Sequence, residues 1–97
     1  MTDKNIQLAI QVVPLERNGN VYEQIDAAIE VIQQSGVEYM ITPMETVMQG
    51  PYEKLQVVAR EAQEALVDAG CNEFLVNIKM HIRTDRDVTM EEKRLDR

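Results

Sequence analysis

Two kinds of hydrophobic spacing alternate along this chain, and their order restricts the fold more than any other feature. Apolar residues recur at every second position in residues 6–13 and 74–83, which is the period of a strand with one buried face. They recur every three to four positions in residues 21–32 and 55–69, which is the period of a helix with one apolar side. Between these predicted helices lie two shorter strand-like segments, residues 37–42 and 46–49.

Turn and cap residues mark the ends of these segments. Asn20 followed three residues later by Glu23 has the form of a helix capping box, and Gly36 follows where a left-handed residue would close the same helix. Pro14 ends the first strand, and Pro51 suits the first turn of the second helix. The order is strand, helix, strand, strand, helix, strand. It predicts an α+β, ferredoxin-like βαββαβ fold, in which a four-stranded antiparallel sheet carries two helices on one face.

Length and composition restrict the class of protein. The 97 residues predict one domain, residues 1–97, that ends in a charged tail from about residue 85. A formal net charge of −7 argues against binding to nucleic acid and favours a neutral or cationic ligand. No apolar run approaches the roughly 20 residues of a membrane helix, and no signal-type segment opens the chain. We therefore expect a cytoplasmic protein that does not insert into membranes.

The sheet face opposite the predicted helices, which we call the open face, predicts self-association. Its polar members are Gln7, Gln11, Asn77 and Lys79, and its apolar members are Ala9, Val13, Met40, Val47 and Leu75. A monomer would leave this mixed surface in water, and a small domain gains stability by burying more apolar area. We expect a homodimer or homotetramer that packs through sheet faces. A small sheet that simply exposes some apolar atoms is the alternative.

No group of residues has the sequence spacing of a catalytic or metal centre. The lone His81 falls on the polar side of the last strand, and its spacing from Asp85 and Asp87 matches no metal site. The single Cys71 has no disulfide partner and no histidine or lysine near it in sequence to activate its thiol. Arg17 lacks a glycine-framed phosphate cradle. We expect a solvated histidine, a half-buried cysteine, no enzymatic activity, and no bound metal or cofactor.

The hairpin between the two short strands is the strongest candidate for a binding site. A two-residue turn, at Pro43-Met44 or at Met44-Glu45, puts the side chain of Thr46 on the helix side of the sheet. A hydroxyl in that layer must be hydrogen-bonded to backbone, water or a ligand. A threonine satisfied by its own hairpin is the alternative. In this topology the third strand begins beside the end of the first strand and near the start of the first helix.

Several stretches of the chain, taken together, carry a family resemblance. They are Ile10-Gln11-Val12-Val13-Pro14, Ile29-Glu30-Val31-Ile32 with Ser35-Gly36, Tyr39-Met40-Ile41-Thr42-Pro43-Met44-Glu45-Thr46, Gly50, and Ile78-Lys79. Over nearly its whole length the chain resembles the small thiamine-binding protein family. The resemblance implies sheet-packed dimers or tetramers and binding of thiamine or its hydroxymethylpyrimidine moiety without catalysis, in transport, salvage or buffering. That family usually has a glycine where this chain has Glu45.

A pocket for a pyrimidine needs a few fixed polar groups within apolar walls. The candidate ligand-binding residues, in order of rank, are Thr46, then Met44 and Glu45, then Gln11 and Asn77, with Tyr22 as part of the wall. Strand alternation puts Gln11 and Asn77 on the open face, so they would reach such a ligand only around an edge or across a subunit boundary. The alternative function is an ACT-like regulatory or interaction module that binds another small metabolite or a protein partner.

Overall fold

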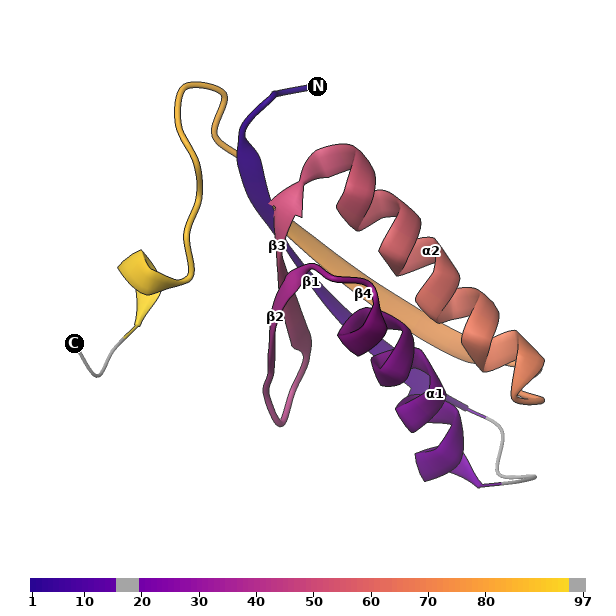
Figure 1. Ribbon diagram of the computed structural model, residues 1–97. Helices are drawn as coiled ribbons and strands as arrows, with labels where there is room; N and C mark the ends of the chain where they lie inside the picture. The colour runs from indigo at the N-terminus through magenta and orange to yellow at the C-terminus, as the bar shows by residue number, and fades with distance from the viewer. Residues whose placement is uncertain (16–19, 95–97) are drawn as a thin grey trace.

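The helices and strands of the computed structural model follow in the predicted order (Figure 1). They are β1 (Asn5–Pro14), α1 (Val21–Gln34), β2 (Glu38–Ile41), β3 (Thr46–Pro51), α2 (Tyr52–Asp68) and β4 (Phe74–His81), followed by a turn of 3-10 helix at Glu91–Lys93. The structure describes residues 1–15 and 20–94. Asn20 Oδ1 accepts a hydrogen bond from the Glu23 amide at 3.2 Å, so the predicted cap of α1 is confirmed. Gly36, with φ at +85°, follows α1 in the left-handed conformation as expected.

The four strands form one antiparallel sheet in the order β2-β3-β1-β4, and both helices cover the same face of it (Figure 1). The predicted ferredoxin-like fold is therefore confirmed. β1 is the longest strand, and its two neighbours, β3 and β4, pair with different lengths of it. Its pairing with β3 ends at Ile10–Thr46, whereas its pairing with β4 continues to Pro14–Phe74. The end of β1 therefore extends beyond the β2–β3 hairpin.

The core lies between the sheet and the two helices, where the two predicted periodicities meet. Alternate residues of β1 face the apolar sides of α1 and α2, and Met48 of β3 joins them. The buried cluster consists of Ile6, Leu8, Ile10, Ala28, Ile32, Met48, Leu55, Val58, Ala59, Ala62, Leu66 and Cys71. Burial of this apolar layer is the main source of stability for a domain of this size. Cys71, expected to be half-buried, is fully part of the core.

Some strand ends differ from the sequence-based bounds, because pairing decides them. β3 runs to Pro51 rather than to residue 49, since Pro51 still pairs with Asn5 of β1. β2 ends at Ile41 rather than at residue 42, because Thr42 already belongs to the turn. β4 ends at His81 rather than at residue 83. Periodicity along one strand does not report where its partner ends.

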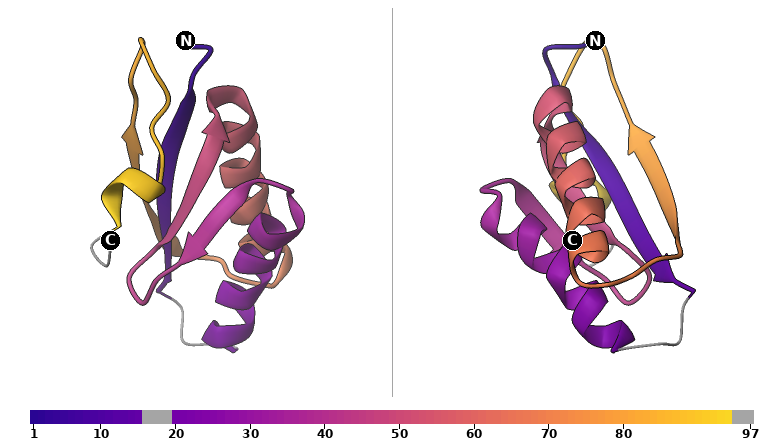
Figure 2. Two further views of the ribbon diagram at one scale, coloured as in Figure 1. Left: turned by 60° about the vertical axis from the view of Figure 1, so that its left-hand side comes forward. Right: turned by 90° about the vertical axis from the view of Figure 1, so that its right-hand side faces the viewer.

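The C-terminal tail is the main correction to the sequence analysis, which assigned it no structural role. After β4 the chain turns back and runs across the open face of the sheet, so that the sheet lies between the tail and the helices (Figure 2). Val88 is completely buried, and its amide donates to the carbonyl of Asn5 at 3.0 Å. The Met90 amide donates to Oε1 of Gln49 at 2.7 Å. Main-chain hydrogen bonds and one buried apolar side chain therefore dock the tail.

A charged clamp closes the tail on itself. The guanidinium of Arg83 donates to both carboxylate oxygens of Glu92, at 2.8 and 2.9 Å. The Thr89 amide donates to the same carboxylate at 2.8 Å. The hydrogen bonds from Arg83, and then that from Thr89, lower the pKa of Glu92 from 4.5 to about 2. The clamp therefore requires Glu92 to be ionised.

This clamp predicts that docking of the tail depends on pH in the acid range. Because folding lowers the pKa of Glu92 from 4.5 to about 2, the clamp stabilises the docked tail fully above about pH 4.5, and this stabilisation is lost as the pH falls through about 2. An acid titration followed by the amide NMR signal of Met90 should show the loss. Glu92→Gln should abolish this pH dependence, whereas Glu91→Gln, a neighbour outside the clamp, should retain it. An unchanged titration in Glu92→Gln would contradict the assignment.

Candidate functional site

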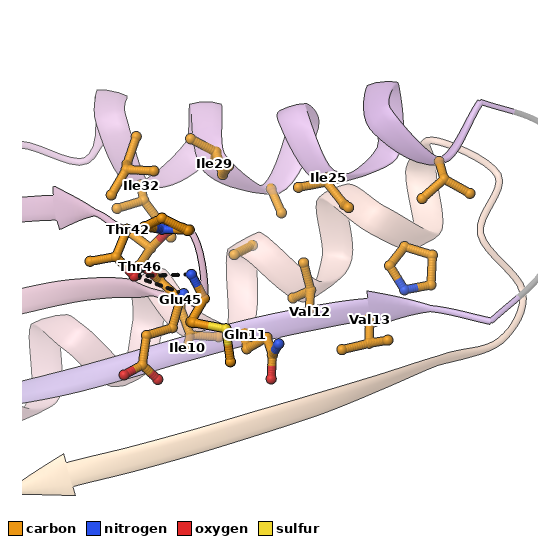
Figure 3. A pocket seen from close by; sticks show the side chains of 17 residues that line it. Ile10, Gln11, Val12, Val13, Ile25, Ile29, Ile32, Thr42, Glu45 and Thr46 are labelled. Carbon is orange, nitrogen blue, oxygen red and sulfur yellow. Dashed lines mark hydrogen bonds between the residues drawn. The ribbon is translucent and has the colours of Figure 1, made fainter.

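A cavity of about 350 Å³ lies between α1 and the sheet, at the end where β1 extends beyond β3 (Figure 3). Its cause is the strand register. Beyond Ile10–Thr46, β1 continues to Pro14 with β4 beside it, but β3 has already ended. The space beneath the first turns of α1 is therefore not filled by side chains of β3.

The walls of this cavity are mainly apolar. On α1 they come from positions three or four apart, which face the sheet together. The principal apolar wall residues are Val12, Val21, Ile25, Ile29, Ile32 and Ile41. Figure 3 shows the side chain of Val12 pointing toward α1, while its neighbours Gln11 and Val13 point to the other side of β1. Strand alternation thus keeps the amide of Gln11 out of the apolar interior.

The hairpin turn at the edge of the cavity is held by Thr42, which the sequence analysis did not single out. Its hydroxyl accepts from the amides of Met44 and Glu45, at 3.2 and 3.0 Å, and donates to the carbonyl of Glu45 at 2.6 Å. The Thr42 amide also donates to the Glu45 carbonyl at 2.9 Å. Of the two turns considered, the structure adopts the one centred on Pro43-Met44. A threonine directly before the proline of a turn is the sequence feature that could have identified Thr42.

Thr46, the first-ranked candidate, lies on the helix side of the sheet as predicted. Its pairing with Ile10 and Ile41 fixes that orientation, and its side chain lines the cavity with only 6% of the residue exposed. Within residues 1–15 and 20–94 no hydrogen bond to its hydroxyl is found. The threonine satisfied by its own hairpin is Thr42. The hydroxyl of Thr46 is therefore free to bond a molecule in the cavity.

The other candidates divide between the two sides of the sheet. Met44 is exposed at the tip of the hairpin and borders the cavity together with Glu45. The carboxylate of Glu45 forms an ion pair with Lys79 on the open face, at 3.2 Å. Asn77 donates to Oε1 of Gln11 at 3.2 Å on that same face. A second cavity there, of about 540 Å³, is lined by Gln11, Met44, Glu45, Asn77, Ile78 and Lys79.

Tyr22 is the candidate that the structure does not bring to the site. Its residue is 80% exposed, and it lines neither of the two cavities around the hairpin. The reason is its phase on α1. Val21 and Ile25, four residues apart, face the cavity, and a step of one residue turns a side chain by about 100° to another face of the helix.

The residues weighed for catalysis lie apart from the cavity. The thiol of Cys71 is buried and donates to the carbonyl of Glu73 at 3.4 Å. His81 is on the open face with Nδ1 only 2.6 Å from Nζ of Lys93, so it is packed against the tail rather than fully solvated as expected. Within residues 1–15 and 20–94 no group of three or more His, Cys, Asp or Glu residues could hold a metal. Arg17 lies outside the described residues.

In the described part of the chain, no helix combines the length and the apolar character needed to cross a bilayer.

The contrast between the two hairpin threonines predicts different effects on stability. Thr42→Val removes three hydrogen bonds between side chain and backbone and should lower the free energy of unfolding by about 1 to 2 kcal/mol. Thr46→Val, which removes none within the described residues, should change it by less than about 0.5 kcal/mol. Urea unfolding of the two variants measures both values. Equal losses would mean that Thr46 has a structural partner after all.

Comparison with known proteins finds relatives of this chain by sequence and by structure. The profile of the thiamine-binding protein family matches residues 8–96. A UPF0045 protein of Clostridium perfringens is 30% identical over 86 residues, which are 89% of this chain and 90% of that protein. A Bacillus cereus domain of unknown function, DUF77, is 42% identical with a TM-score of 0.88, covering 93% of this chain and 86% of its own.

A second solved structure carries a name related to the vitamin. It is a Thermotoga maritima protein named for thiamine biosynthesis/salvage, 28% identical with a TM-score of 0.82, and the match covers 92% of this chain and 94% of that one. The profile match, the curated relative and the two structures all span most of the chain. The resemblance seen in the sequence is thereby confirmed: this chain belongs to the thiamine-binding protein family.

Proposed function

We propose that this protein binds thiamine, or its hydroxymethylpyrimidine moiety, in the cavity between α1 and the sheet, and releases it unchanged. The observation that carries the proposal is the hydroxyl of Thr46, which borders an apolar cavity without a hydrogen-bond partner in the described residues. Membership in the thiamine-binding protein family supports a role related to this vitamin. Transport, salvage and buffering are all roles that need binding without turnover.

The size and lining of the cavity suit a small heteroaromatic ring. Its volume of about 350 Å³ is at the lower end of the range of small-molecule sites, roughly 300 to 1,000 Å³. Isoleucine and valine side chains offer apolar contact to ring faces, and the Thr46 hydroxyl can both donate and accept, as the edge of an aminopyrimidine requires. Where β3 has ended, the edge of β1 from Gln11 to Pro14 supplies further backbone N–H and C=O groups.

The electrostatics favour a cationic ligand over an anionic one at this cavity. The chain has a formal net charge of −7, and Glu45 borders the cavity while its carboxylate lies next to Lys79 on the open face. The Lys79 side chain of this ion pair is largely exposed to solvent. The pair therefore contributes little to stability. Rotation of the Glu45 side chain toward the cavity would let its carboxylate offset the positive charge of a thiazolium ring. Such a role would give this position a function that the family's usual glycine lacks.

The positions of His81 and Cys71 support binding without catalysis. His81 is on the open face, whereas the cavity is on the helix side of the sheet, so its imidazole does not reach a ring bound there. The thiol of Cys71 is buried and bonded to a backbone carbonyl. Among the described residues, the thiol contacts the Glu73 carbonyl and the imidazole contacts Lys93, and neither contact joins a nucleophile to a base beside the cavity.

The first test of this proposal is Thr46→Val, which keeps the shape of the side chain and removes its hydroxyl. Its affinity for thiamine should fall by about 1 kcal/mol, or up to about 3 kcal/mol if a buried ligand group loses its partner. Titration calorimetry against thiamine and hydroxymethylpyrimidine measures the change. Thr84→Val removes an exposed hydroxyl from the loop after β4 and should bind as the wild type does. Equal affinity in all three proteins would move the site away from the hairpin.

We also propose that the open face assembles two copies of the chain. The tail already covers part of this face, since Gln7 is buried beneath Lys93, and Ala9, expected at the interface, is nearly buried within the monomer. The apolar part that stays in water includes Met40 and Leu75, which are 45% and 54% exposed. These two residues are on the same face, on the outer strands β2 and β4. Packing this remainder against a second copy would remove it from water.

The test of assembly compares two equally exposed apolar residues on opposite sides of the molecule. Leu75→Lys puts a charge on the open face and should dissociate a dimer or tetramer into monomers of 11.1 kDa. Val67→Lys, on α2 and 58% exposed, should leave the assembly intact. Light scattering with size-exclusion chromatography gives the masses. A monomeric wild type, or dissociation by Val67→Lys and not by Leu75→Lys, would contradict the proposed interface.

A further inference from the structure

Lys93 is a cation held in place by two neutral groups. Its Nζ donates to Oε1 of Gln7 at 2.7 Å and lies 2.6 Å from Nδ1 of His81. Among residues 1–15 and 20–94, no carboxylate forms an ion pair with it. An ammonium has three N–H donors, and these two contacts use two of them. A positioned cation with a donor to spare and no counter-ion is suited to receive an anion.

The contact with Lys93 also fixes the state of His81. An ammonium can only donate, so Nδ1 of the imidazole must accept, and the ring proton of the neutral form is on Nε2. Desolvation, and then the positive charges of Lys93 and Arg83, lower the pKa of His81 below its usual 6.5. The ring is therefore neutral at pH 7 and presents Nε2–H as a second donor.

Both groups border a cavity of about 380 Å³ on the open face, where the tail crosses β1 and β4. The small side chain of Ala9 and that of Val47 form part of its floor. Lys79 supplies a third donor, and its side chain is 76% exposed and paired with Glu45. Glu45 is the one carboxylate among the described lining residues. Arg83, which follows the end of β4, is already neutralised by Glu92.

We propose that this cavity binds a phosphoryl group, either as inorganic phosphate or as a phosphate ester. A phosphoryl group presents several oxygens in different directions, and the donors here are on separate side chains: Lys93, His81 and Lys79. Its negative charge supplies the counter-ion that Lys93 lacks among residues 1–15 and 20–94. The site is on the opposite face of the sheet from the cavity assigned to thiamine, so the inference stands independently of that function.

His81 is the only histidine of the chain, so its imidazole NMR signals report on the site directly. Inorganic phosphate, added near neutral pH at constant ionic strength, should shift these signals saturably and raise the pKa of His81, because an anion stabilises the imidazolium. Thiamine monophosphate and thiamine are titrated in parallel. A saturable shift with the monophosphate alone would identify an ester as the source of the phosphoryl group. A shift with thiamine alone, or with none of the three, would overturn the proposal.

Three variants separate a built site from general attraction of anions. Lys93→Met should weaken phosphate binding about tenfold or more, equivalent to about 1.4 kcal/mol. Lys54→Met removes the same charge from an exposed position on α2 and should change the affinity by less than about twofold. Equal weakening by the two would overturn the proposal. If Lys93→Met releases the tail, Lys79→Met tests the site instead, because the side chain of Lys79 is mostly exposed. A phosphate affinity of Lys79→Met equal to that of Lys54→Met would then overturn the proposal.

Discussion

The unequal pairing of β1 with its two neighbours is the constraint on which the rest of the structure depends. β3 follows β1 only as far as Ile10–Thr46, whereas β4 follows it to Pro14–Phe74. The hairpin must turn where β3 begins, so the turn at Thr42 comes to lie beneath α1 and next to the open end of β1. Because β3 ends before β1 and β4 do, a cavity remains in the apolar layer. A longer hairpin would fill it. A shift of the β1–β3 register by one residue would turn Thr46 away from that cavity.

Strand alternation then separates two kinds of chemistry across one sheet. The helix side of β1 and β3 has Val12 and Thr46 facing isoleucine side chains of α1, which suits the faces and one polar edge of a small ring. The open side has His81, Lys79 and the tail residue Lys93, which suit a charged group. Glu45 stands between them, because it borders both cavities and is paired with Lys79. The backbone keeps the two regions apart.

The sequence was sufficient for the elements and for the orientation of Thr46, because both follow from local rules. The period of the apolar residues identifies strands and helices, and turn length alone decides which side of the sheet Thr46 faces. The tail was missed because Val88 is a single apolar residue in a charged stretch, and its burial depends on docking against β1, far away in sequence. Tyr22 was misplaced because the cavity faces only Val21 and Ile25 of the first helical turns, and the phase of α1 against the sheet is set by tertiary packing.

A ligand on the helix side of β1, beside Thr46, contacts other methyl groups than a ligand on the open face. Val12 points into the cavity (Figure 3), whereas Val47 and Leu75 are on the open face. Nuclear Overhauser contacts between the pyrimidine protons of bound thiamine and methyl groups of the protein distinguish the two sides. With the ligand beside Thr46, we expect contacts to Val12 and Ile25. Contacts to Val47 and Leu75 instead would place the ligand on the open face and contradict the position beside Thr46.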